Sequence, residues 1–187
     1  EGFAQPYEFT LNLSSRCKET DIVIPSSSGG SFTAAMQAFE QKSGQLVVTN
    51  KSLAAMGYGL SGAIGAAIAG SGRRTVLMEG DGGFSQNLQE LATVRAQNLP
   101  IKIFLHSNLG YASIRLLQLS YFDGQYLGCD ADTGLGMPDW PLLFKAYGIP
   151  SCEVFDSSLD SPELLELFNA PGPAGFIVHV HPEQTYF

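Results

Sequence analysis

The chain has 187 residues, of which 44% are hydrophobic, enough for the core of one domain. Its 10 Lys and Arg against 18 Asp and Glu give a net charge of −8, which argues against a surface for nucleic acids or anionic membranes, since both require clustered positive charge. The cysteines Cys17, Cys129 and Cys152 form no C-x-x-C pair, so we expect neither a disulfide framework nor a zinc site, and a reducing cytoplasm fits best. The longest apolar run, 63–69, is far shorter than the ~20 residues of a membrane span, so we expect a soluble protein.

Strand and helix patterns alternate along the chain. The expected strands are short, rich in β-branched residues and mostly without polar alternation, as strands buried on both faces tend to be. In chain order we expect strand 21–25, helix 32–41, strand 45–49, helix 59–69, strand 75–79, helix 87–97, strand 101–106, helix 111–119, helix 138–147, strand 152–155, helix 162–168 and strand 176–181. This order predicts a single α/β domain with a mostly parallel six-stranded sheet. The stretch 123–137 lacks periodicity and is either a functional loop or poorly ordered.

The third expected strand runs directly into a glycine-rich turn that contains one acidic residue, in the sequence LMEGDGGFSQN. Asn108 ends the next strand, with 25 residues between it and the Gly80-Asp81-Gly82 turn, so a carboxylate and an amide oxygen reach the same edge of the sheet. Mg²⁺ prefers such oxygens and completes its octahedron with water and phosphate. Gly82 and Gly83 would let the backbone approach a phosphate group, and the following helix would offer unpaired N–H groups to the same anion.

A second glycine motif, GYGLSG at 57–62, matches the G-x-G-x-x-G fingerprint of dinucleotide-binding domains, and Glu79 follows Gly57 by 22 residues. That fingerprint requires its first glycine to leave a strand directly, so that the pyrophosphate meets the helix N-terminus. Here the residues NKSLAAM intervene after the expected strand 45–49. We therefore favour glycines that allow close helix packing, and a dinucleotide-binding oxidoreductase domain is the weaker alternative.

The turn, the spacing and the sequence around Asn108 resemble a known family. The G-D-G turn, 25 residues and the sequence NLGY are similar to the diphosphate-binding module of thiamine-diphosphate-dependent enzymes. The segment GDGGFSQNLQELATVRAQNLPIKIFLHSNLGYASIR resembles the acetolactate-synthase branch in particular. The resemblance extends over essentially the whole chain, from the strand at 21 to the strand at 181, and implies a three-layer α/β/α thiamine-diphosphate-binding fold.

The resemblance also implies a metal site and a diphosphate site. Asp81, Asn108 and the backbone carbonyl of Gly110 would ligate Mg²⁺. The family often has two asparagines where this chain has Ser107-Asn108, and the metal-binding one matches Asn108. The other cofactor-binding residues expected from these two motifs are Gly80, Gly82, Gly83 and Tyr111.

Two further segments are expected to contact the cofactor. By the same resemblance, Met56 would wedge between the two cofactor rings and enforce a bent conformation, and the carbonyl of Ala54 would accept a hydrogen bond from the aminopyrimidine. In isolation Met56 would instead be interpreted as a gap-filling core residue. The loop PSSSGGS follows the first strand and precedes a helix, which places Ser28, Gly29 and Gly30 where they could touch the diphosphate, although a serine-glycine loop is often only a helix cap.

In the resembling enzymes the cofactor lies between two modules, and the glutamate that activates it belongs to the other one, the pyrimidine-binding module. We therefore expect the present chain to be a subunit or a domain of a larger homodimeric or higher oligomeric enzyme, inactive alone, with no catalytic residue of its own. The complete enzyme would decarboxylate a 2-oxo acid such as pyruvate and ligate the acyl unit to a small-molecule acceptor, either a keto acid or a keto-sugar. Whether it also carries a flavin is left open, and a non-catalytic assembly or regulatory module of the same fold is the alternative.

Overall fold

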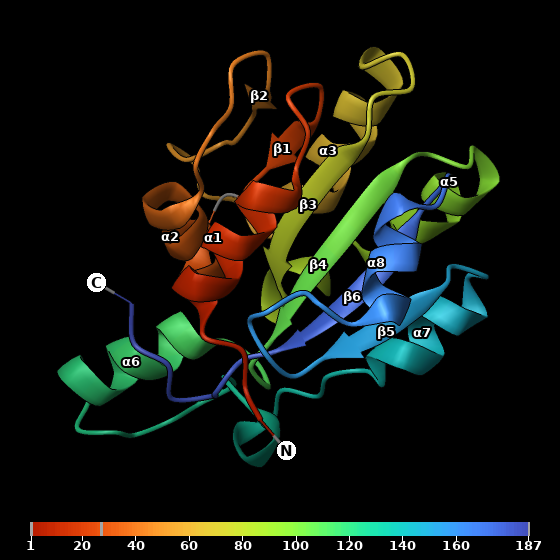
Figure 1. Ribbon diagram of the computed structural model, residues 1–187. Helices are drawn as coiled ribbons and strands as arrows, with labels where there is room; N and C mark the ends of the chain where they lie inside the picture. Colours follow the sequence, from red (N-terminus) through yellow and green to blue (C-terminus); the bar gives the residue numbers. More distant parts are fainter. Residues whose placement is uncertain (1, 27, 187) are drawn as a thin grey trace.

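The computed structural model describes residues 2–26 and 28–186, and its centre is one six-stranded sheet (Figure 1). The strand order is β2-β1-β3-β4-β6-β5, and every neighbouring pair is parallel. The prediction of an α/β fold with a six-stranded parallel sheet is therefore confirmed. The strands are β1 (Ile22–Ile24), β2 (Leu46–Val47), β3 (Thr75–Gly80), β4 (Ile101–Ser107), β5 (Ser151–Val154) and β6 (Ala174–His179).

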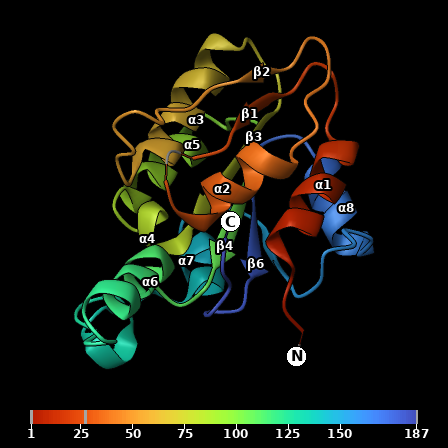
Figure 2. The same ribbon diagram turned by 90° about the vertical axis from the view of Figure 1, so that its left-hand side faces the viewer.

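Helices cover both faces of the sheet and give three layers (Figure 2). Apolar side chains of α1, α2 and α8 form one core with the sheet, and those of α3, α5 and α7 form the other. The helices are α1 (Pro6–Arg16), α2 (Gly29–Ala38), α3 (Tyr58–Ala69), α4 (Asp81–Phe84), α5 (Leu91–Ala96), α6 (Ala112–Tyr121), α7 (Trp140–Ala146) and α8 (Pro162–Asn169), with 3₁₀ turns η1 (Leu88–Glu90) and η2 (Ala131–Thr133).

The central strands lack polar alternation because both of their faces are buried. Along β3, Val76 and Met78 enter the core shared with α1, whereas Leu77 enters the core shared with α3. On β4, Phe104 stacks on Phe176 of β6 at a centroid distance of 4.5 Å. Each such side chain contributes about 1.5–3 kcal/mol when it is fully buried, so these strands anchor the positions that follow them.

The structure differs from the sequence-based expectations in two places and adds a detail in a third. Helix α1 was not expected from the sequence. Its first turn is stabilised by Pro6 at its start and by the Gln5 side chain, which accepts a hydrogen bond from the Glu8 N–H. The helix expected over 87–97 is divided into η1 and α5, and a separate short helix, α4, begins at Asp81 itself. The stretch 123–137 contains η2, where the Asp130 side chain caps Thr133. None of the helices within 2–26 and 28–186 combines the length and apolarity needed to cross a membrane.

The strand order places a topological switch point between β1 and β3, because the chain moves outward from β1 to β2 and then returns to the other side of β1. Ligands of open parallel sheets bind at such points, outside the carboxyl ends of the strands. The register pairs Gly80 of β3 with His106 of β4, so the residues after both strands emerge side by side.

Candidate cofactor site

A pocket of about 250 Å³ opens at the carboxyl ends of β1, β3 and β4. Its wall contains all twelve residues that the sequence analysis assigned to cofactor binding: Ser28, Gly29, Gly30, Ala54, Met56, Gly80, Asp81, Gly82, Gly83, Asn108, Gly110 and Tyr111. The remaining lining residues are Ser26, Ser31, His106, Ala112, Ser113 and Ile114. Four chain segments that are far apart in sequence therefore meet in one cavity.

Asp81 is the buried charge of this pocket, with only 1% of its surface exposed. Its Oδ1 accepts a hydrogen bond from the Gly82 N–H at 2.7 Å, and its Oδ2 accepts from the N–H groups of Asn108 and Gly110 at 3.0 and 3.2 Å. Burial raises the pKa of this carboxyl to about 6, and the surrounding N–H groups oppose that rise. Asp81 is therefore predominantly ionised at neutral pH.

One oxygen of Asp81 lies close to the side-chain oxygen of Asn108, which also approaches the carbonyl oxygen of Gly110. The side-chain oxygen of Asn108 lies 3.2 Å from Oδ1 of Asp81 and 2.9 Å from the carbonyl oxygen of Gly110, with no hydrogen between them. Turning the amide over would let its NH₂ group donate to both oxygens. A cation removes the same conflict without the turn. Neighbouring ligands of an octahedral Mg²⁺, at ~2.0–2.1 Å from the ion, are about 2.9 Å apart, so this donor set fits a small divalent cation.

Glycine is required at different positions of the pocket for different structural reasons. A Cβ atom on Gly82 would lie 2.3 Å from Cδ1 of Tyr111, and one on Gly30 would lie 2.1 Å from Cζ of Tyr186. These two glycines allow aromatic rings to pack against the pocket. Gly29 has φ +77°, and no described atom lies within 4 Å of its Cβ position, so it is required by backbone conformation and leaves open space. Its neighbour Ser28 makes no side-chain capping bond within the described chain, which leaves N–H groups of the first turn of α2 available to an anion.

Ala54 and Met56 lie on the connection that leads from β2 to α3. Ala54 has φ +51°, an uncommon conformation for a residue with a side chain and one that clusters at functional sites. Met56 is 48% exposed at the pocket, so the interpretation of this residue as core filling is wrong. The connection therefore carries a strained backbone and an apolar side chain into the same cavity.

Residues that the sequence analysis missed also line this pocket or pack against it. His106, at the end of β4, has both ring nitrogens buried without a hydrogen-bond partner among the described residues, and burial lowers its pKa to about 4. Ser31 Oγ and the hydroxyl of Tyr186 are likewise buried and unpartnered within the described chain. The position of His106, two residues before Asn108 at a carboxyl strand end, is the one signal that could have identified it from sequence. Buried polar atoms without a partner are uncommon in folded proteins, where bound water, an ion or a ligand usually accounts for them.

Glu79 is a second buried carboxyl, outside the pocket lining. The N–H groups of Gly59 and Leu60, in the first turn of α3, face it, and the Ser26 hydroxyl lies 3.4 Å from its Oε1. Burial raises its pKa to about 7. The Gly57–Gly62 motif is thus explained by packing: Gly59 makes room for this carboxylate, and Gly57 has φ +88° before the helix. Residues 48–56 separate β2 from Gly57, whereas the dinucleotide fingerprint requires its first glycine to follow a strand directly.

Comparison with known proteins agrees with this geometry. Residues 28–178 match the family model described as "Thiamine pyrophosphate enzyme, C-terminal TPP binding domain". The chain is 33% identical over 176 residues to acetolactate synthase 2, chloroplastic, of Brassica napus, covering 90% of this chain and 27% of the relative. It is 27% identical over 177 residues to the acetolactate synthase isozyme 1 large subunit of Escherichia coli (strain K12), covering 95% of this chain and 31% of the relative.

A solved structure with the same fold is the benzoylformate decarboxylase from Polynucleobacter necessarius. The TM-score is 0.82 at 20% sequence identity, and the match covers 98% of this chain and 34% of that chain. The present chain therefore spans about a third or less of the proteins it matches.

Proposed function

Because this chain belongs to the thiamine pyrophosphate enzymes, as the C-terminal TPP-binding domain of an acetolactate-synthase-like member, we propose that its pocket binds thiamine diphosphate together with Mg²⁺. The observation that carries the proposal is that the Asn108 side-chain oxygen lies 3.2 Å from Oδ1 of Asp81 and 2.9 Å from the Gly110 carbonyl oxygen, close to the separation of about 2.9 Å between neighbouring ligands of an octahedral Mg²⁺. The complete enzyme would decarboxylate a 2-oxo acid such as pyruvate and ligate the acyl unit to a keto acid or keto-sugar. When bound, the cofactor supplies the electron sink that this chemistry needs.

The residues of this chain would position the cofactor. Asp81, Asn108 and the carbonyl of Gly110 hold the cation. The backbone at Gly82 and Gly83 would lie beside the diphosphate, although the Gly82 N–H is itself bonded to Oδ1 of Asp81. The N–H groups at the start of α2, near Ser28, Gly29 and Gly30, would donate to the diphosphate. Ala54 offers a carbonyl to the aminopyrimidine, the half-exposed Met56 supports the bend between the rings, and Gly80 and Tyr111 complete the wall.

An acidic chain can bind this anion because the local charges differ from the net charge. The chain carries a net charge of −8, but the ligand would meet a divalent cation and the N-terminal turn of α2. The dipole of a helix is equivalent to roughly +0.5 charge at its N-terminus, which attracts an anion. Among the described residues that line the pocket, Asp81 carries the one carboxylate, and in this proposal the cation neutralises it.

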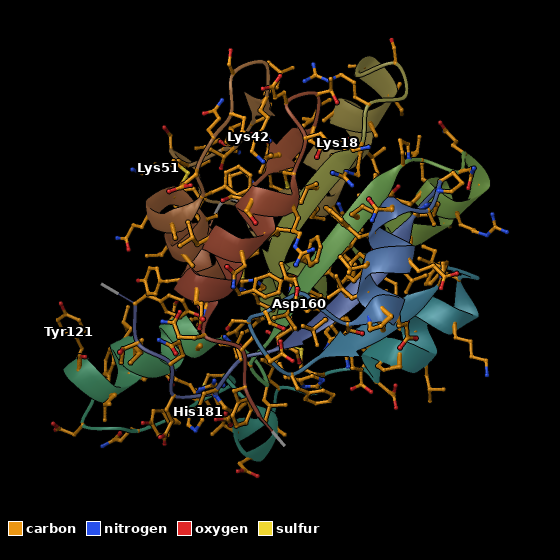
Figure 3. All side chains as sticks on the ribbon, in the orientation of Figure 1. Lys18, Lys42, Lys51, Tyr121, Asp160 and His181 are labelled. Carbon is orange, nitrogen blue, oxygen red and sulfur yellow. The ribbon has the colours of Figure 1, made fainter. Side chains whose placement is uncertain are left out.

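A partner module would complete the site. The pocket is smaller than the ~300–1,000 Å³ of typical whole-ligand sites. Beside it, α6 extends away from the sheet (Figure 1), and Ala112 is its one buried residue. Leu117, Leu119 and Tyr121 on this helix are 50%, 55% and 80% exposed, and Tyr121 points away from the body of the protein (Figure 3). Such an apolar surface fits contact with the pyrimidine-binding module of the same or another chain, in a homodimer or higher oligomer. The cytoplasmic location expected from the cysteines stays a prediction.

Thermal unfolding tests the proposal directly. A ligand that binds only the native state raises the melting temperature, and at 100 times its Kd it adds about 2.7 kcal/mol. We expect thiamine diphosphate with MgCl₂ to raise the melting temperature of the intact protein, and EDTA to cancel the shift. NAD should produce no shift. A shift with NAD and none with thiamine diphosphate would support the dinucleotide-binding alternative and overturn the proposal.

A further inference from the structure

Arg115 of α6 connects three separate segments through its guanidinium group. Its Nη2 donates to the carbonyl oxygens of Asn108 and Pro182, each at 2.9 Å. Its Nη1 lies 3.3 Å from the carbonyl oxygen of Leu109 and 3.4 Å from that of Cys129. The partners are the loop after β4, the loop before η2 and the C-terminal segment, which runs past α6 (Figure 1). All four hydrogen-bond partners are neutral backbone carbonyls, so Arg115 holds backbone, and its charge also acts on the Asp130 carboxylate.

Two peptide groups lie between Arg115 and Asp81. The peptide that joins Asn108 to Leu109 has its C=O on Arg115, and the N–H of the same peptide faces the Asp81 carboxylate. The peptide that joins Leu109 to Gly110 repeats the arrangement, with its C=O towards Arg115 and its N–H donating to Oδ2 of Asp81 at 3.2 Å. Each peptide dipole is therefore aligned between a cation and an anion, which stabilises its orientation.

The loop needs such support because its backbone is strained. Leu109 has φ +64° and Gly110 has φ +132°. A Cβ atom at Gly110 would also lie 2.3 Å from the carbonyl oxygen of Cys129, which is itself bonded to the Tyr111 N–H at 2.8 Å. Left-handed conformations in a residue with a side chain are unfavourable and persist only where surrounding contacts enforce them. Released from Arg115, the loop would no longer hold the Asn108 side chain and the Gly110 carbonyl at one point.

We propose that Arg115 is a positioning residue for the cation site, holding the 108–110 loop in the conformation that brings three oxygens together. The identity of the bound cation rests on the proposed function, whereas the contacts of Arg115 with the loop are independent of it. Partners that orient metal ligands typically change metal affinity by about 10–100-fold when they are removed.

The test compares Arg115→Met with Arg73→Met in the intact protein. Arg73 is a matched control at the opposite end of the sheet, because it is also half-buried and also bridges carbonyl oxygens, those of Thr20 at 2.6 Å and Gly44 at 3.0 Å. Mg²⁺ is titrated calorimetrically in the presence of thiamine diphosphate. We expect Arg115→Met to weaken Mg²⁺ binding about 10–100-fold. Arg73→Met should lower the melting temperature but leave the Mg²⁺ affinity unchanged. Arg115→Lys, which keeps the charge but not the planar fork, should be intermediate.

A second measurement needs no ligand. Amide hydrogen exchange of Leu109 and Gly110 in ligand-free protein should be roughly tenfold faster or more in Arg115→Met, since the C=O groups of the same two peptides lose their hydrogen bonds to a charged group, while β3 and β4 keep their protection. Unchanged exchange at these amides, or equal loss of Mg²⁺ affinity in Arg73→Met, would overturn the positioning role. If wild-type protein bound no thiamine diphosphate, the proposed function would fail, and the exchange rates alone would decide whether Arg115 orders the loop.

Discussion

The carboxylate of Glu79 occupies the space that a side chain at Gly59 would need. A Cβ atom on Gly59 would lie 2.3 Å from Oε2 and 2.7 Å from Oε1 of Glu79. The contact joins the end of β3 to the first turn of α3, whose N–H groups face the same carboxylate. A glycine motif that looks like a nucleotide fingerprint is thus explained by the packing of a helix onto a buried acid.

Two alanine substitutions within α3 should have opposite effects. Gly65→Ala places its Cβ in open space outside the backbone of its own helix, so it should stabilise the protein by about 0.5–1 kcal/mol through helix propensity. Gly59→Ala gains the same propensity but must displace the Glu79 carboxylate, and we expect net destabilisation. Urea unfolding of both variants measures the difference. Equal stabilisation by the two would show that Glu79 moves aside freely.

The pH dependence of stability should reveal the burial of Glu79. Its pKa is about 7 in the folded protein against 4.5 for the ordinary group. Between these values the unfolded chain releases its proton while the folded chain retains it, so stability falls as pH rises from 4.5 to 7 and this loss levels off above 7.

Glu79→Gln removes this loss while its amide oxygen can still accept from the Gly59 and Leu60 N–H groups. The stability of the variant relative to the wild type should therefore increase by roughly 2 kcal/mol as the pH is raised from 5 to 8, as the linkage between the two pKa values requires. Urea unfolding in EDTA at the two pH values provides the measurement. A gain that did not grow with pH would mean that Glu79 is ionised at pH 5 in the folded protein.

The sequence predicts the centre of the site because parallel strands bring their carboxyl ends to one edge. The Gly80-Asp81-Gly82 turn and Asn108 follow adjacent strands, so their proximity needs only the strand assignment and the β3–β4 pairing. The six strands were likewise predictable from buried β-branched runs. Boundaries were less accurate, as β6 begins at Ala174 and ends at His179 instead of running from 176 to 181.

What the sequence does not predict depends on contacts between distant segments. Arg115 and Pro182 are 67 residues apart, and no periodicity relates them. The helix α1 has few inward apolar residues, among them Phe9 and Leu13. Its stability comes from packing onto the sheet, where the ring centroids of Phe9 and Phe104 are 5.7 Å apart. Neither contact leaves a local pattern that a reading of the sequence could detect.

Asp81→Asn should abolish Mg²⁺-dependent retention of thiamine diphosphate and keep the fold. The amide oxygen can still accept backbone hydrogen bonds such as those from Asn108 and Gly110, but the variant lacks the charge that a divalent cation requires. Calorimetry with thiamine diphosphate and MgCl₂ measures binding, and circular dichroism checks the fold. Retention of wild-type affinity would remove Asp81 from the metal site.

The wild-type site should show a related pH dependence. The Asp81 pKa of about 6 refers to the protein without a metal, and a protonated carboxyl cannot ligate Mg²⁺. Apparent Mg²⁺ affinity should therefore fall as pH drops below 6, approaching tenfold per pH unit, and stay nearly constant above 7. Affinity that is independent of pH between 5 and 7 would contradict the role of this carboxylate.

Residues 1–187 produced alone should be catalytically silent. Among the described residues the pocket lining contains one carboxylate, Asp81, which the proposed function assigns to the cation. Glu79 is buried under α3 outside the lining, so no acid of the described lining is left to activate the cofactor. Without a partner module the site would also stay open to water, which weakens electrostatic stabilisation of the reaction. The measurement is the exchange of the C2 hydrogen of thiamine diphosphate for deuterium by NMR, with Mg²⁺ present, alongside carbon dioxide release from pyruvate. Both rates should equal those of free cofactor. Acceleration that survives in Glu79→Gln would point to another residue of this chain, and acceleration lost in that variant would make Glu79 the activating acid; either result would refute the two-module proposal.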